Sequence, residues 1–157
     1  MRMFSGMTHP LQVVIASRSL EGRRGIATVL IRLGLDPICV SSISQCRELL
    51  VREDVDVDVV FSDRFLADGD YSDLLSVCRA SRVQPYLVLA CPHTNTEYQQ
   101  AIAEGVFEVI AVPYRPTDIE WMLIQVRRKR DKRDSDGFDG VTADLIPIRK
   151  PPAKNIA

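Results

Sequence analysis

The segment from Asp56 to Asp63 constrains the fold of this chain more than any other part of the sequence. It contains an apolar run of β-branched and aromatic residues, Val59 to Phe61, and it ends in a carboxylate. Such a run is typical of a strand that is buried on both faces of a parallel sheet. In open α/β sheets, ligands and chemistry collect just beyond the carboxyl ends of the strands. Asp63 is therefore the first candidate functional residue.

Four further apolar segments have the length of buried strands. They occupy residues 11–16, 35–40, 86–91 and 107–112. Between them, apolar residues recur at helical spacing, as in the series Ile26, Val29, Leu30 and Leu33. This alternation predicts an α/β fold with three layers, in which a doubly wound, five-stranded parallel sheet lies between helices.

Capping boxes predict where three of the helices begin. They pair Ser42 with Gln45, Thr94 with Glu97, and Thr117 with Glu120. The last helix carries an apolar stripe and is expected to end in the basic run at Arg130. The sequence thus divides into an N-terminal extension (1–10), one domain (11–130) and a tail (131–157). The charges, Gly and Pro of the tail predict disorder or a linker.

Composition and charge exclude several classes of protein. The net charge of −1 gives no basic field for nucleic acid, and the basic run from Arg127 to Arg130 suits a solvated helix C-terminus. No apolar run is long enough to cross a bilayer, and the first ten residues lack the apolar core of a signal peptide, so we expect a cytoplasmic protein. Cys91 and His93 can supply two metal ligands but have no second pair nearby, which argues against a metal centre.

The order of these elements resembles the response-regulator receiver domain of two-component signalling. The resemblance covers Leu11 to Arg130 and is carried by ordered landmarks. They are the strand-three segment 58–63, the turn Asp68–Gly69, the segment 85–89, the segment 103–106, and the segment 111–114 that contains Pro113. The resemblance implies the flavodoxin-like strand order 2-1-3-4-5, and it places Asp63 at the phosphoacceptor position.

The pocket that surrounds the acceptor in receivers is altered here. Ser17 and Arg18 stand where the family has the pair of acids that holds Mg²⁺. Ala90 replaces the Ser or Thr that hydrogen-bonds the phosphoryl group, and Val112 replaces the Lys that ion-pairs with it. Val109 stands where the family has the aromatic residue that rotates on activation, and Ala67 replaces the Pro of the loop after the acceptor.

These departures predict a pseudo-receiver. Phosphoryl transfer depends on positioning and on neutralising the charge of the phosphoryl oxygens, and Asp63 alone is a poor site for Mg²⁺ because Asp68 and Asp70 are expected to point outward. We therefore expect a non-enzymatic signalling module without a cofactor, which acts through protein contacts with a histidine kinase, an output protein or a second copy. The alternative is a working phosphoreceiver that accepts a phosphoryl group on Asp63, and only this alternative would require Mg²⁺.

The segment from Ser17 to Ser19 leaves two readings open. The Arg18 guanidinium can reach Asp63 and take the place of the metal ion, or it can point to solvent. The hydroxyls, the cation and the free N–H groups of this loop are also suited to an anion, which gives a small-molecule-binding module as a further alternative.

Tyr114 and Trp121 are candidates for an interface. The apolar stripe of the last helix faces the sheet and turns Trp121 toward its flank, where an exposed aromatic can anchor a partner. The alternative is that Trp121 packs against Tyr114 within the monomer.

Overall fold

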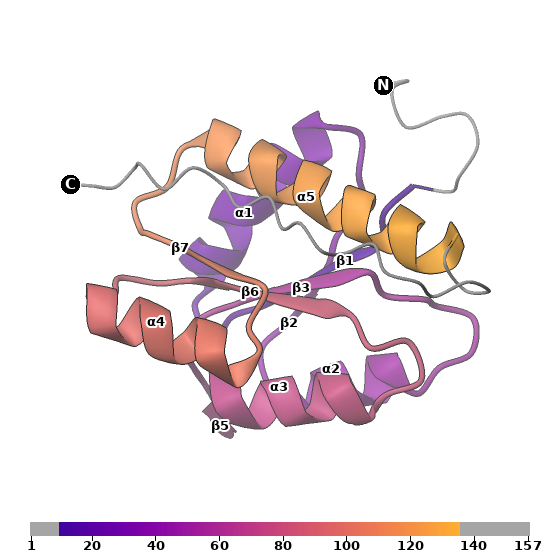
Figure 1. Cartoon of the computed structure of the whole chain (residues 1–157), viewed down its shortest axis with the longest axis horizontal. Helices are drawn as coiled ribbons and strands as arrows, with labels where there is room; N and C mark the ends of the chain where they lie inside the picture. The colour runs from indigo at the N-terminus through magenta and orange to yellow at the C-terminus, as the bar shows by residue number, and fades with distance from the viewer. Residues whose placement is uncertain (1–9, 136–157) are drawn as a thin grey trace.

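The chain is described here from a computed structural model, which covers residues 10–135 (Figure 1). Its main strands are β1 (Val13–Ala16), β2 (Ile38–Val40), β3 (Val59–Ser62), β6 (Tyr86–Ala90) and β7 (Glu108–Ile110). Its helices are α1 (Leu20–Arg32), α2 (Ile43–Leu50), α3 (Tyr71–Ala80), α4 (Asn95–Glu104) and α5 (Pro116–Ser135). The five strands are parallel in the order β2-β1-β3-β6-β7, which confirms the predicted order 2-1-3-4-5.

Two layers of helices enclose the sheet. Figure 1 shows α1 and α5 on one face and α2, α3 and α4 on the other. The central strand β3 explains why both faces must be covered, because all four of its residues are buried. Val59 and Phe61 join the core beneath α1 and α5, whereas Val60 joins the core beneath the other three helices. This alternation is the two-residue period of a strand, and it gives the domain two apolar cores.

The helix starts follow the predicted caps in two cases out of three. Ser42 caps α2 by accepting from the N–H of Gln45 at 3.1 Å, although Gln45 directs its own side chain to Ser41. Thr94 and Glu97 form a complete capping box at the start of α4. The box predicted at Thr117 is wrong, because α5 already begins at Pro116. Proline suits the first helical position, since its fixed φ and its missing N–H cost nothing there.

The last helix continues past the predicted end at Arg130 as far as Ser135. Arg130 is therefore not part of a solvated terminus: its side chain is 8% exposed and forms an ion pair with Asp58, which is 10% exposed, at 3.3 Å. The remainder of the predicted tail and most of the N-terminal extension lie outside the described residues. Among residues 10–135, no helix has the length and apolar character needed to span a membrane.

A short hairpin follows β3 and was not predicted. β4 (Phe65–Leu66) and β5 (Gly69–Asp70) pair antiparallel in the segment after Asp63. As expected, neither Asp68 nor Asp70 turns toward Asp63: Asp68 is exposed and Asp70 is half-buried, and both carboxylates lie at helix starts. Asp68 accepts from the N–H groups of Ile43 and Ser44 at 2.7 and 3.1 Å, and Asp70 is the N-cap of α3. Orphan N–H groups at helix starts attract carboxylates, and the hairpin brings both acids to such starts.

Candidate functional site

Asp63 lies at the carboxyl edge of the sheet, one residue beyond β3, as its sequence position predicts. Its N–H donates to the carbonyl oxygen of Ala16 at 3.2 Å, which continues the pairing of β3 with β1 past the end of the strand. The side chain is half-buried. This register places the residue that follows β1, Ser17, next to Asp63.

The Ser17 hydroxyl makes the defining contact of the site. It donates to Oδ2 of Asp63 at 2.6 Å, a short bond typical of a hydroxyl that faces a carboxylate. Ser17 is only 2% exposed, so water competes poorly for this bond. A hydrogen bond to a charged group stabilises a protein by about 1.5–3 kcal/mol. One oxygen of the candidate acceptor is therefore held by the protein itself.

Neighbouring groups fix Ser17 in place. Its N–H donates to the carbonyl oxygen of Val40 at 3.0 Å, and its Oγ accepts from the N–H of Ser19 at 3.1 Å. The Arg23 guanidinium donates to its carbonyl oxygen. A methyl group at Gly22 would come within 2.9 Å of its Oγ, so only glycine leaves this hydroxyl undisturbed. Sequence reasoning missed Arg23 and Gly22, although a glycine inside a helical pattern was an available signal.

The proposed Arg18–Asp63 ion pair is wrong. Arg18 is exposed, and no ion pair or hydrogen bond joins it to Asp63 within residues 10–135. The buried position directly after β1 belongs to Ser17, so the next side chain points away from the site. Of the two readings of Arg18, the one in which its side chain points to solvent agrees with the structure, and Ser17, the other altered position of this loop, contacts Asp63.

The loop from Ser17 to Ser19 uses its polar groups internally. Ser19 is the N-cap of α1 and accepts from the N–H of Gly22 at 3.0 Å, while Ser17 binds Asp63. The Oγ atoms of Ser17 and Ser19 are thus both engaged in contacts within the protein.

The three remaining positions of the altered pocket contribute only apolar groups. Ala90 ends β6 and is buried against the core under α1 and α5, and Val109 of β7 belongs to the opposite core. Val112 follows β7 and is exposed. None of these side chains carries a donor or a cation, so no side chain at these positions can bind phosphoryl oxygens.

The residues around Asp63 do not fit a resident Mg²⁺. A hard divalent cation requires several oxygen ligands, and carboxylates hold it best. Asp63 is the carboxylate at this edge, and Ser17 already donates to one of its oxygens. Asp68 and Asp70 cap helices, and no group of three His, Cys, Asp or Glu side chains in the described part of the chain is placed to hold a metal ion.

Arg64 follows Asp63 in the sequence, but its guanidinium makes its contacts with other residues. Arg64 forms an ion pair with Glu97 of α4 at 3.2 Å, and its guanidinium lies over the ring of Phe65, 5.6 Å from the centroid. The backbone N–H of Thr94 lowers the pKa of Glu97, and Arg64 lowers it further. This pair ties the loop after Asp63 to the start of α4.

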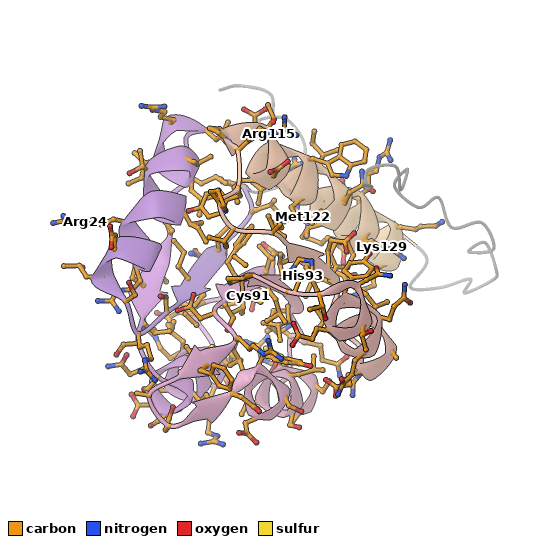
Figure 2. The ribbon with its side chains drawn as sticks, turned by 90° about the vertical axis from the view of Figure 1, so that its left-hand side faces the viewer. Arg24, Cys91, His93, Arg115, Met122 and Lys129 are labelled. Atoms are coloured by element: carbon orange, nitrogen blue, oxygen red, sulfur yellow. The ribbon has the colours of Figure 1, made fainter. Side chains whose placement is uncertain are left out.

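Cys91 and His93 follow β6 and lie near each other at this side of the molecule (Figure 2). The contact is between Nδ1 of His93 and the backbone oxygen of Cys91, at 2.9 Å. Burial raises the pKa of the Cys91 thiol. The raised pKa disfavours the thiolate form that a metal ion requires of a cysteine ligand.

Tyr114 and Trp121 do not stack on each other. Tyr114 is half-buried against α1, where a methyl group at Gly25 would come within 2.6 Å of its hydroxyl. Trp121 is 40% exposed, and the ring contacts of the described residues include no pair of these two side chains. Trp121 is therefore exposed enough to contact a partner, as predicted, whereas Tyr114 packs within the domain.

Comparison with known proteins identifies the fold. The signal receiver domain of an HD domain-containing protein from Pseudomonas fluorescens Pf-5 superposes with a TM-score of 0.71 and 18% identity, over 82% of this chain and 95% of that one. A response regulator receiver domain from Clostridium thermocellum gives 0.70 and 15%, over 78% and 98%. The beryllofluoride-activated NtrC4 receiver domain dimer gives 0.67 and 12%, over 75% and 97%.

No family model matches the sequence, and no curated protein is significantly similar to it. The chain therefore has the fold of response-regulator receiver domains, at a sequence identity that shows the fold alone. The flavodoxin-like arrangement expected from the resemblance is confirmed.

Proposed function

We propose that this chain is a receiver-like module of a two-component signalling system that does not accept a phosphoryl group and acts through protein contacts. The hydrogen bond between Ser17 and Asp63 carries the proposal. It occupies one oxygen of the acceptor carboxylate with a neutral donor, at the place where receivers assemble acids and Mg²⁺.

The chemistry of phosphoryl transfer supports the same conclusion. Catalysis of this reaction consists almost entirely of positioning and of electrostatic stabilisation of the transferred group. Loss of one such donor typically costs about 3 kcal/mol, or about a hundredfold in rate. Ala90 and Val112 remove two donors, and Ser17 removes the acid beside Asp63. The proposed module is not an enzyme, needs no cofactor and works in the cytoplasm.

Incubation with acetyl phosphate and Mg²⁺, followed by intact mass spectrometry, tests the proposal. The expected result is an unmodified chain under conditions in which a conventional receiver is phosphorylated. The Asp63→Asn variant is the control for modification elsewhere. A phosphoryl group mapped to Asp63 would instead establish the alternative, a working phosphoreceiver.

The partners follow from the same proposal. A module that does not change state by phosphorylation has to signal by binding, so the candidates are a histidine kinase, an output protein or a second copy of the chain. The net charge of −1 argues against direct binding to nucleic acid.

A further inference from the structure

A groove of about 720 Å³ lies between helices α2 and α3. These helices lie side by side and cover the face of the sheet opposite α5 (Figure 1). Leu50 lies at the floor of the groove and is buried, whereas Val51 on its wall is 69% exposed. Clefts that bind ligands in proteins commonly have volumes of about 300–1,000 Å³. The groove is therefore large enough for a short peptide segment, and its exposed apolar wall favours a segment with apolar side chains.

The two ends of the groove differ in charge. At the end where the two helices begin, it is lined by Asp68 and Asp73, both of which are exposed. Each of these carboxylates caps a helix, but a carboxylate has about four acceptor sites and keeps its negative charge in a cap. Arg47 on the wall of α2 offsets one of the two charges. At the other end, where the helices finish, the lining residues are Val51 and Ala80. A complementary segment is therefore apolar at this end and basic at the acidic end.

Helix α5 ends close to the apolar end of the groove. The guanidinium of Arg133 donates to the backbone oxygen of Gln84 at 3.2 Å. The N–H of Gln84 donates in turn to Oγ of Ser81, which lines the groove, at 3.1 Å. Residues 136–157 follow α5 in the sequence and lie outside the described residues. The part of the chain that follows α5 therefore starts beside the groove.

The sequence after α5 contains a segment with the order of side chains that the groove requires. Residues 145–148 are apolar, and Arg149 and Lys150 follow them directly. The nine residues 136–144 separate this segment from α5, and nine residues span up to about 30 Å, which is about twice the length of the ten-residue helix α3. Pro147 reduces the conformational entropy that the segment loses on binding.

We propose that segment 145–150 of this chain docks in the groove between α2 and α3 of the same molecule. Its apolar residues cover the wall at Val51, and its two basic residues lie at the acidic end beside Asp73. A short linker keeps such a segment at an effective concentration of about a millimolar, so weak affinity is sufficient, and a second copy at micromolar concentration competes poorly. The docked segment excludes any partner that would bind α2 and α3. This inference goes beyond the proposed function and does not depend on the chemistry of Asp63.

Paramagnetic relaxation enhancement on the full chain tests this contact. A nitroxide is attached at position 153 by Ala153→Cys in a Cys39→Ser background, because the other three cysteines are buried. Amide signal intensities are compared before and after reduction of the nitroxide. The expected result is a strong loss of intensity at Ser44 of α2 and Ser76 of α3, and no loss at Thr28 of α1, which lies on the other face of the sheet.

Variants on both sides of the contact test its residues. Val51→Asp places a charge on the apolar wall and abolishes the loss of intensity. Ile31→Asp is the matched control: it changes a similarly exposed apolar side chain on α1 and leaves the loss unchanged. Asp73→Lys weakens docking, as does the double change Arg149→Glu with Lys150→Glu, whereas the three substitutions together restore it. Circular dichroism verifies that each variant is folded.

A mixing experiment separates docking within one molecule from docking between two copies. Isotope-labelled chains without nitroxide are combined with unlabelled chains that carry it, and docking within one molecule leaves the observed signals unchanged. A loss of intensity at α2 and α3 in this mixture would overturn the inference in favour of a contact between copies. Absence of the loss in the doubly labelled chain, or a loss that survives Val51→Asp, would also overturn it. The acetyl phosphate test of Asp63 is decided separately from each of these results.

Discussion

The Oγ of Ser17 lies 2.6 Å from Oδ2 of Asp63. An acid at position 17 would therefore bring a second carboxylate close to that of Asp63. Two carboxylates at that distance cannot both ionise unless a cation lies between them. A serine there avoids this repulsion and supplies a donor to one oxygen of Asp63. At the scale of single residues, the proposed function therefore depends on a hydroxyl, rather than an acid, at position 17.

The Ser17→Asp variant should make the stability of the domain depend on Mg²⁺. Without a divalent cation, we expect it to unfold about 1–3 kcal/mol more easily than the wild type, because a charge-assisted hydrogen bond is replaced by repulsion. Millimolar Mg²⁺ should recover part of that loss, since a cation that binds only the folded state stabilises it. Thermal denaturation with and without Mg²⁺ measures both effects.

The wild type is the control for this variant, and its melting temperature should not respond to Mg²⁺ beyond the general effect of salt. An equal response in the wild type would mean that Asp63 already binds the ion, and it would contradict the assignment of a silent site.

At the scale of elements, α5 is attached to the sheet by a buried polar contact as well as by its apolar stripe. Arg130 forms an ion pair with Asp58, and the same carboxylate oxygen accepts from the N–H of Gln12 at 2.8 Å. Arg133 adds a second attachment, with its guanidinium 4.8 Å from the ring centroid of Tyr86. These contacts hold the C-terminal turns of α5 against the edge of the sheet opposite Asp63.

Loss of one partner of the buried pair should be costly. We expect Arg130→Met to lower the free energy of unfolding by about 3 kcal/mol, because the buried carboxylate of Asp58 loses its ion pair with Arg130. The double variant Asp58→Asn with Arg130→Met should be less destabilised than Arg130→Met alone. Urea denaturation measures both, and Arg128→Met is the exposed control that should change stability little. Equal losses for Arg128→Met and Arg130→Met would refute a special role for the pair.

The cap that Asp68 places on α2 should give stability a dependence on pH. The backbone N–H of Ile43, followed by that of Ser44, lowers the pKa of Asp68 in the folded state. A carboxyl group with a lowered folded pKa stabilises the fold above its unfolded pKa of about 3.9, and this contribution is lost as the pH falls through the folded pKa. The difference in melting temperature between the wild type and Asp68→Ala should therefore be constant above about pH 5 and should close below about pH 4. If the difference in melting temperature persisted below about pH 4, the negative charge of Asp68 would not be the reason that the cap stabilises α2.

For the molecule as a whole, periodicity was sufficient to predict the sheet and its helices, because burial of β3 on both faces requires two helical layers. Periodicity could not predict contacts between side chains that are distant in sequence. Nothing local distinguishes Asp68, which caps a helix 25 residues away, or Arg130, whose partner is 72 residues away. The same limit explains why the sequence left two readings of Arg18 open, since one residue of register decides which side chain of the loop meets Asp63.

The proposed function predicts which substitutions would let the whole domain be phosphorylated on Asp63. Ser17→Asp adds an acid beside Asp63, Ala90→Thr adds a hydroxyl at the end of β6, and Val112→Lys adds a cation after β7. The triple variant should be modified by acetyl phosphate and Mg²⁺ at least about a hundredfold faster than the wild type, because each restored group contributes to stabilising the transferred oxygens. Intact mass spectrometry over time gives both rates, and the triple variant that also carries Asp63→Asn shows that the gain depends on this carboxylate. If a folded triple variant remains unmodified, the obstacle to phosphorylation lies outside these three positions.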